Sequence, residues 1–324
     1  MSTVPVLGVT PAKGFSTQLS AADVLVGEVP LSQLVPIVNP GDTPPGIPQD
    51  LTSGVTDLQM NRQIDGASYA VLQLQDASRS ILNSALFDFG DTMTFDGLNF
   101  ALVAFAKQAD QLQITFEAAL AYDLRKQTGP LAWKSATDLV GFVAHLLTAV
   151  PGATLKAEPG PVSFDTGSGF TASTTVSQSV TISRGTTSTP NEDSWTAINR
   201  LANSAGYRAY ECEGVLYLGS DAWLMSEFGS AGTLTEFTPA ILNMDGTYDI
   251  GMPLGQVTVT AMSDLWPWKP GDAVTLARMG PLGRNPWLVF SMARNLYNPQ
   301  GTMTLQAPMS AEAVRLGTPT LQYL

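Results

Sequence analysis

The first candidate for chemistry is residues 165–168, which read Asp-Thr-Gly-Ser, the signature loop of aspartic proteases. Those enzymes hold two facing aspartates that share one proton, because two close carboxylates cannot both ionise. A two-lobed protease would carry a second Asp-Thr-Gly or Asp-Ser-Gly triplet, but the chain has none, and residues 245–247 read Asp-Gly-Thr. A protease that uses Asp165 is therefore kept only as a minor alternative, since four-residue matches are weak signals.

Two acidic residues, a histidine and a cysteine are the other isolated candidates. Glu211 and Glu213 share one face of a predicted strand, as glycosidase carboxylates can, but they flank Cys212 just before Gly214, which favours a solvated hairpin tip. His145 has no Ser-His-Asp context and is expected to be a hydrogen-bonded structural residue. Cys212 is expected to be a small packed side chain. We assign no catalytic, cofactor-binding or metal-ligating residue and predict that the protein is not an enzyme.

Two further short motifs were considered as possible functional sites. Asp88-Phe89-Gly90 spells the metal-binding triplet of protein kinases, but the chain lacks a glycine-rich nucleotide loop and a His-Arg-Asp loop. We interpret it as a passage from a strand into a turn. Trp266-Pro267-Trp268 lies beside a predicted turn, and its indoles can either fill a core or anchor a partner. Both interpretations stay open.

The composition narrows the function classes. The chain has 324 residues and a net charge of −12, which argues against binding nucleic acid through phosphate contacts. One cysteine and one histidine exclude a disulfide framework and disfavour a zinc site, and no cofactor is predicted. No apolar run approaches the ~18–20 residues that span a bilayer, and no secretory signal is expected. Charged residues are only 14%, which suits a β-rich chain whose surface is covered by partners.

Alternation with a period of two predicts antiparallel strands on both sides of a helical region. The turns before that region are placed at Asp65-Gly66 and Asp110. The inward-facing residues before it are Leu58, Met60, Ile64, Ala70, Leu72, Leu74, Leu98, Phe100, Leu102, Leu112, Ile114 and Phe116. Those after it are Val257, Val259, Val274, Leu276, Leu288, Phe290, Met292, Met303 and Leu305. These sets predict two β-barrels or sandwiches.

Two amphipathic helices are predicted between the strands. The first carries an apolar stripe over residues 139–150 and ends at Pro151-Gly152. The second is capped by Asn191 or Ser194 and stops at Gly206, because glycine readily adopts the left-handed conformation that ends helices.

The fold class is therefore mainly β with an α+β insertion, in five regions. Residues 1–50 form an extended proline-rich arm, and residues 51–130 form a first tube-like β-module. Residues 131–250 form a small α+β region, which contains a Ser/Thr-rich insertion at 153–190. Residues 251–308 form a second module completed by strands from the middle region, and residues 309–324 form a tail. The arm suits either a segment lying along a neighbouring subunit or a disordered tail.

Several patterns in the second half of the chain carry a family resemblance. A W-x-x-I-x-x-L-A helix begins at Trp195, and it leads into G-Y-R-x-Y at 206–210 and G-V-L-Y-L-G at 214–219. Pro-Gly-Asp at 270–272 precedes a strand, and further strands follow to residue 305. With the earlier hairpins, residues 55–308 resemble the tail hub, or baseplate hub, proteins of tailed bacteriophages, which are related to the hubs of contractile injection systems.

The resemblance implies a homotrimer in which each chain supplies two tail-tube-like modules, so that six modules adapt a sixfold tail tube to a threefold tip. It implies a channel for DNA exit without sequence-specific binding, and as partners a distal tail ring protein, the tape measure protein and tail fibre or spike proteins. The expected location is the virion tail tip, after assembly in the host cytoplasm.

Two expectations accompany this interpretation. A trimer would carry a formal charge of −36, three times the −12 of one chain, so we expect acidic residues to outnumber basic ones along the channel. The competing class is a surface- or carbohydrate-binding β-module, which would present an exposed aromatic platform.

Overall fold

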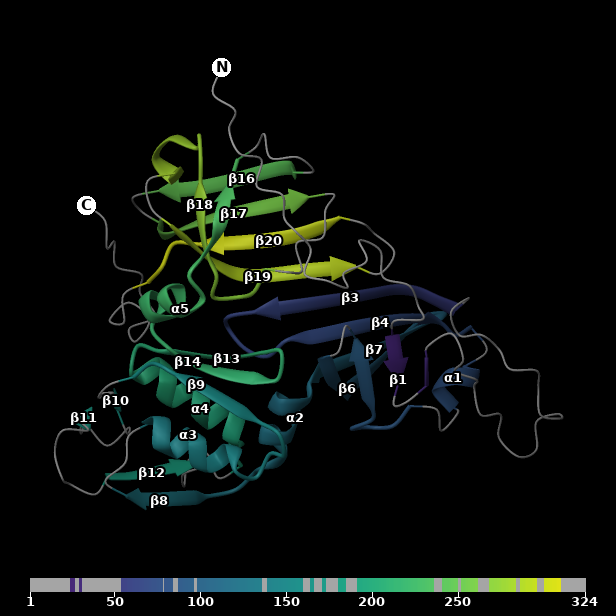
Figure 1. The fold of residues 1–324 in the computed structure, drawn as a ribbon. Helices are drawn as coiled ribbons and strands as arrows, with labels where there is room; N and C mark the ends of the chain where they lie inside the picture. The colour runs from purple at the N-terminus through teal and green to yellow at the C-terminus, as the bar shows by residue number, and fades with distance from the viewer. Residues whose placement is uncertain are drawn as a thin grey trace.

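The computed structural model describes residues 24–26, 29–30, 54–77, 79–83, 87–95, 98–135, 139–159, 164–165, 171–172, 180–184, 191–235, 241–249, 252–261, 268–283, 286–295 and 300–309 (Figure 1). Most of the predicted arm, the tail from residue 310 and much of the 153–190 insertion lie outside these ranges. None of the helices among the described residues is both long enough and apolar enough to cross a membrane.

One thirteen-stranded sheet runs through the described residues in the order β16-β17-β20-β19-β3-β4-β7-β6-β5-β1-β2, with β15 and β18 attached beside β19 (Figure 1). The strands of this path are β16 (Ile241–Asp249), β17 (Met252–Ala261), β20 (Gly301–Gln306), β19 (Trp287–Asn295), β3 (Val55–Gln63), β4 (Tyr69–Gln75), β7 (Gln111–Ala118), β6 (Leu98–Gln108), β5 (Thr92–Phe95), β1 (Val24–Val26) and β2 (Val29–Pro30). The β19–β3 ladder joins the two halves of the sheet.

The first half follows the predicted alternation closely. Strands β3 to β7 enclose one hydrophobic cluster. Of the twelve residues predicted to face inward before the helices, eleven are buried and Leu98 is partly buried. Strands β6 and β7 are joined by a two-residue turn in which Ala109 has a φ of 48° and Asp110 follows it, as predicted. A short helix, α1 (Ser80–Asn83), begins where the Asp76 carboxylate accepts hydrogen bonds from two backbone amides. The first β-module thus combines the hairpins β3–β4, β5–β6 and β6–β7 with the longer-range ladder between β4 and β7.

The second half has its own core and two departures from the prediction. β15 (Ser230–Leu234) lies parallel to β18 (Ala273–Leu276), and η4 (Gly280–Gly283) follows. A β-bulge between Val289 and Ser291 shifts the register of β19. Because a bulge turns the following side chains to the other face, Val289 and Met292 enter the core while Leu288 and Phe290 join a different cluster. The prediction that Leu288, Phe290 and Met292 share one face is therefore wrong.

The helical region packs beside the sheet around a separate core. Its helices are α2 (Ala119–Lys126), α3 (Leu139–Leu147) and α4 (Ser194–Ser204), while α5 (Asp221–Phe228) packs in a different cluster, with Tyr210 and Leu288. One sheet of this region contains β9 (Thr154–Ala157), β13 (Arg208–Cys212) and β14 (Val215–Gly219). Two further two-stranded sheets pair β8 (Leu131–Ser135) with β12 (Val180–Arg184) and β10 (Phe164–Asp165) with β11 (Thr171–Ala172). The predicted apolar stripe of α3 is buried, and on α4 the side chains of Trp195, Ile198, Leu201 and Ala202 are buried.

The caps of α4 differ in part from the prediction. Asp193, not Asn191 or Ser194, is the N-cap, and its carboxylate accepts a hydrogen bond from the Thr196 amide at 2.7 Å. At the other end Gly206 has a φ of 75°, and its amide bonds to the Asn203 carbonyl, so the predicted glycine stop is confirmed.

Two boundaries follow from the packing. Helix α2 shares the core of the helical region, and β15 and β16 belong to the second half of the sheet. We therefore propose that the first module ends near residue 118 and the second begins near residue 230. The predicted class, mainly β with a small α+β region between two β-modules, is confirmed.

Candidate functional site

The predicted protease residue lies in a short ladder. Asp165 belongs to β10 and pairs with Thr171 of β11, while the rest of its motif, residues 166–168, lies outside the described residues. Among the residues that the structure describes, no group of three or more His, Cys, Asp or Glu side chains is placed to hold a metal ion.

The kinase-like triplet forms a turn. The Asp88 amide donates to the Asp91 carboxylate at 2.7 Å, and the Gly90 φ of 89° reverses the chain before β5. Gly90 also lies so close to α2 that a Cβ atom there would be 2.6 Å from the Tyr122 hydroxyl. The predicted turn is thus present, but it leads into strand β5 and does not follow a strand, since the described element before it is helix α1.

His145 and Trp268 take structural positions. The exposed His145 ring stacks on Trp133 with centroids 5.4 Å apart, and this stacking is the contact seen for its side chain among the described residues. Trp268 is buried in the core of the second module, which favours the core interpretation of its motif. Trp266 and Pro267 lie outside the described residues.

The hairpin β13–β14 is the element that brings the predicted acidic residues together. Glu213 and Gly214 form its two-residue turn, with φ values of 57° and 75°. Cys212 is buried as expected, and this burial raises the pKa of its thiol to about 12. Such a thiol stays protonated and is not a nucleophile at neutral pH.

The prediction of a solvated tip is wrong for Glu211. Its side chain is 4% exposed, and one carboxylate oxygen accepts a hydrogen bond from the Gly214 amide at 2.8 Å. Burial raises the pKa of Glu211 above its usual range. The reason is that the loop after β3 covers the hairpin, where the Ser68 hydroxyl donates to the Glu211 carbonyl at 3.2 Å.

Glu213 connects three parts of the chain. Its carboxylate pairs with Arg62 of β3 at 3.4 Å and with Lys269, which precedes β18. Arg62 is 3% exposed and Glu213 is 32% exposed. The tip of the helical region's hairpin is thus held by one cation from each β-module.

Uncharged contacts surround this junction. The Tyr210 hydroxyl donates to the Pro270 carbonyl at 2.9 Å, and burial raises the pKa of that hydroxyl well above its usual value. Gly271, with a φ of 101°, permits this contact, because a Cβ atom there would lie 2.5 Å from the Tyr210 oxygen. Tyr210 also packs with Ile64 and Leu288 in one cluster that spans all three regions.

Sequence reasoning missed Arg62 and Lys269. Arg62 occupies the same inward register as Leu58 and Met60 on β3, and a charged residue in such a register signals a buried partner. That signal was present in the sequence, but it does not say which acid is the partner. Lys269 offers no comparable signal, because only the fold brings it to Glu213.

A candidate site for assembly with other chains is formed by the β19–β3 ladder, which we call the seam, and by the two edge strands of the sheet. β19 and β3 pair from Ser291 opposite Gln63 to Asn295 opposite Gln59. Among the described strands, β16 pairs only with β17 at one end of the sheet, and β2 pairs only with β1 at the other. Such edges present backbone groups that can pair with another chain.

Comparison with known proteins identifies the architecture. No family model matches the sequence, and no curated protein matches it. The fold is similar to that of the tail protein from Neisseria meningitidis MC58, with a TM-score of 0.52 and 13% identity over 78% of this chain and 92% of that chain. It is also similar to the 43 kDa tail protein of prophage MuSo2 from Shewanella oneidensis, with a TM-score of 0.53 and 10% identity over 81% of this chain and 94% of that chain.

A third similar structure comes from a secretion system. The E. coli c3393 protein, a component of the type VI secretion system described as structurally similar to the T4 bacteriophage tail proteins gp27 and gp5, gives a TM-score of 0.51 and 12% identity over 79% of this chain and 74% of that chain. At these identities the likeness concerns architecture alone. The chain therefore has the fold of phage tail proteins, as its resemblance to the tail hub family predicts.

Proposed function

We propose that the protein is a structural hub of a phage tail tip or baseplate and has no catalytic activity. Three copies would form a ring of six β-modules that adapts the sixfold tail tube to a threefold tip. The ring would enclose the channel through which DNA leaves, and it would contact the distal tail ring protein, the tape measure protein and tail fibre or spike proteins.

One observation carries this proposal. The two β-modules have separate cores but are joined edge to edge through β19 and β3 into one sheet. A sheet that continues from one module into the next and has an open strand at each described end can extend into a neighbouring copy by the same kind of pairing. Three such repeats can close a ring around a central channel.

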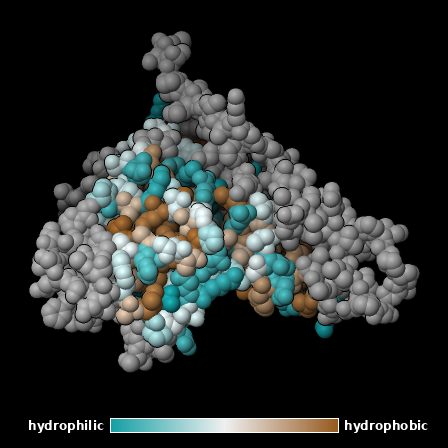
Figure 2. Space-filling view, turned by 60° about the horizontal axis from the view of Figure 1, so that its bottom comes forward, coloured by the Kyte–Doolittle hydropathy of each residue, from teal (hydrophilic) through white to brown (hydrophobic). Residues whose placement is uncertain are grey.

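The alternative surface-binding function has less support. Among the described residues, the large hydrophobic side chains that are exposed are Leu82, Phe89 and Leu242, and only one of them is aromatic. On the face shown in Figure 2, apolar and polar residues are interspersed. This surface does not favour an aromatic platform for sugars.

The oligomeric state of the purified chain tests the proposal. We expect light scattering after size-exclusion chromatography to give three times the 34.3 kDa of one chain, and electron microscopy to show rings. Leu242→Lys places a charge on the edge strand β16, where Leu242 is 52% exposed. It should raise the dissociation constant about tenfold or more, because edge lysines oppose strand pairing.

A control is Ala144→Lys on α3, where the alanine is exposed on the helical region, away from both described ends of the sheet (Figure 1). This variant should associate like the original chain. A chain that stays monomeric at all concentrations, or an equal effect of the two lysines, would contradict the proposed ring.

A further inference from the structure

A pocket of about 330 Å³ lies where the first β-module meets the helical region. Its walls come from the start of β6, from the junction of β7 and α2, from the turn after α3 and from the hairpin tip that carries Glu211 and Gly214. This volume is near the lower end of the range for ligand-binding pockets. The pocket therefore has room for one side chain or one small molecule.

The charged residues of the pocket wall are acidic. They are Asp123, Glu211 and Glu213, and none of the described lining residues is basic. Glu213 already pairs with the two cations of the hairpin junction, and Asp123 pairs with Lys126 at 3.5 Å. Glu211 is the most buried of the three, at 4% exposed against 32% for Glu213 and 42% for Asp123. A cation is the ligand that such a wall attracts.

The Glu211 carboxylate has one unsatisfied oxygen. Its Oε1 accepts a hydrogen bond from the Gly214 amide at 2.8 Å, whereas its Oε2 is buried and has no hydrogen-bond partner among the described residues. Buried polar atoms nearly always have a partner. The last torsion of a glutamate is broad, so the carboxylate can turn toward the pocket that it lines. Glu211 therefore offers an acceptor to a donor in the pocket.

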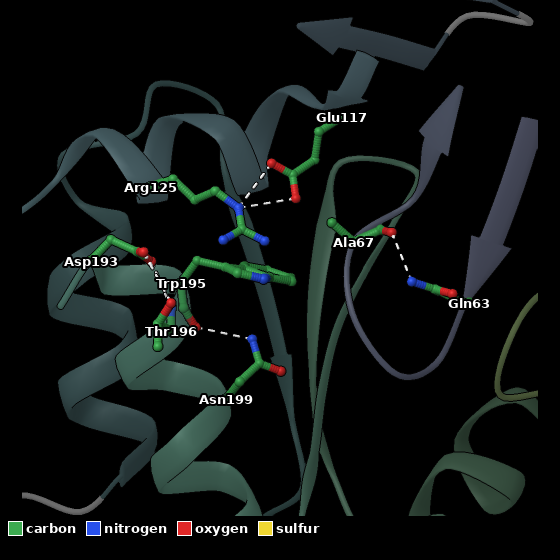
Figure 3. A network of polar contacts seen from close by, with 8 residues as sticks. All are labelled: Gln63, Ala67, Glu117, Arg125, Asp193, Trp195, Thr196 and Asn199. Atoms are coloured by element: carbon green, nitrogen blue, oxygen red, sulfur yellow. Dashed lines mark hydrogen bonds and ion pairs between the residues drawn. The ribbon is translucent and has the colours of Figure 1, made fainter. Parts of the chain in front are cut away.

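Glu117 differs from Glu211 in this respect. Both of its carboxylate oxygens accept from the Arg125 Nε, at 3.0 and 2.9 Å (Figure 3). Its side chain is 14% exposed. Because side chains alternate along β7, Glu117 lies on the opposite face of the strand from Ala118, which lines the pocket. The unsatisfied oxygen is thus particular to Glu211 and does not extend to this neighbouring acid.

The remaining wall is mostly apolar. Phe100, Leu120 and Val150 line the pocket and are buried. A lysine side chain matches this combination, because it carries an ammonium with three donors on a flexible four-carbon stem. The planar fork of an arginine pairs best with both oxygens of one carboxylate, and Oε1 of Glu211 is already bonded to the Gly214 amide. The wall therefore favours lysine over arginine.

We propose that this pocket binds the side chain of a lysine from a partner protein, with the ammonium against Glu211 and the stem against Phe100 and Leu120. Asn99 and residues 151–152 line the pocket and are exposed, so the partner's backbone can lie across the mouth while one side chain enters. An ammonium in the pocket favours the ionised carboxylate, the form that burial disfavours. The proposal does not depend on the trimeric ring.

Titration of the full chain with a lysine mimic tests the proposal. The probe is Nα-acetyl-lysine N-methylamide, which presents the side chain between two peptide groups, and ligand-observed NMR follows its binding. We expect a dissociation constant of about 1 mM or lower. The corresponding norleucine amide, which lacks the ammonium, and the arginine amide should each bind at least about tenfold more weakly.

Two variants and a matched control locate the site. Glu211→Gln keeps the shape of the side chain and removes its charge, so it should weaken binding of the lysine amide about tenfold or more. Ala119→Leu keeps the carboxylate and narrows the pocket from the start of α2, where leucine is a good helix former. It should weaken binding of the lysine and norleucine amides alike. Glu117→Gln should bind the lysine amide as the original chain does, and circular dichroism checks that each variant is folded.

The outcomes are distinct. No binding of the lysine amide to the original chain, or equal binding of the lysine and norleucine amides, would overturn the proposal, and this comparison needs no variant. Unchanged affinity in both Glu211→Gln and Ala119→Leu would also overturn it, because the amide would then bind elsewhere. Binding of n-butylammonium without binding of the lysine amide would overturn the assignment to a protein side chain and would indicate a free amine.

Discussion

The two junctions of this molecule are built in different ways. The β-modules meet at the seam, where β19 and β3 pair through backbone hydrogen bonds over five residue pairs. The helical region meets both modules at the tip of its hairpin, where Glu213 pairs with Arg62 and Lys269. One junction continues a sheet, and the other depends on a few side chains.

Backbone pairing therefore sets the arrangement of the two β-modules, whereas side-chain contacts hold the helical region against them. A backbone ladder tolerates most side-chain changes, because its hydrogen bonds are independent of residue type. A charge contact at a hairpin tip is lost with a single substitution. We therefore expect the seam to resist side-chain substitution and the hairpin contact to be sensitive to it.

The largest effect should come from proline in the seam. Ala293 pairs with Asn61 of β3 on one side and with Thr302 of β20 on the other, so its amide faces a neighbouring strand either way. Ala293→Pro removes that donor from a central strand and should destabilise the chain by about 3 kcal/mol or more. Urea unfolding would measure this loss. Ala293→Thr keeps the amide and suits a strand, so an equal loss in both variants would show that the side chain, not the ladder, matters.

A smaller effect is expected at the hairpin tip. Glu213→Gln removes one of the negative charges near Arg62, which is 3% exposed, and should cost about 2 kcal/mol in the free energy of unfolding. The matched control is Glu117→Gln, which breaks the contact with Arg125, a residue that is 44% exposed. Its cost should stay below about 1 kcal/mol and should shrink further in high salt. Similar costs for the two variants would remove the distinction between the junctions.

Local patterns in the sequence predicted the modules well. The alternation of β3, β4, β6 and β7 and the amphipathic patterns of α3 and α4 could be read directly, because each is fixed by neighbours within a few turns or one hairpin. The stop at Gly206 followed from glycine's access to positive φ. The spacing of the apolar residues along the chain made these predictions of strands and helices correct, and the intrinsic strand or helix propensities of single residues were not needed.

The junctions could not be predicted in the same way. The bulge at Val289 depends on how β19 fits two different neighbours, and no residue type there announces it. Glu211 reads as solvated beside a Glu-Gly turn, but the loop at Ser68 buries it. Asp193 caps α4 although Asn191 and Ser194 are equally suitable by type. In each case, contacts between distant segments decide the outcome.

The smallest effect concerns pH at the same hairpin junction. Asp272 follows Gly271, and burial raises the pKa of its carboxyl from 3.8 to about 6, although its oxygen accepts a hydrogen bond from the Lys269 amide at 2.8 Å. A carboxyl whose pKa is higher in the folded chain binds a proton more tightly there, so it adds stability as the pH falls from about 7 toward 4. Between about pH 7.5 and pH 5 this gain in the free energy of unfolding is about 1 kcal/mol.

The variant Asp272→Asn tests this, because its side chain has no such proton to bind. Urea unfolding should therefore favour this variant over the original chain more at about pH 7.5 than at pH 5, by the same amount. A difference between the two chains that does not change with pH, or that changes with the opposite sign, would show that this carboxyl is not held in a desolvated site at the junction.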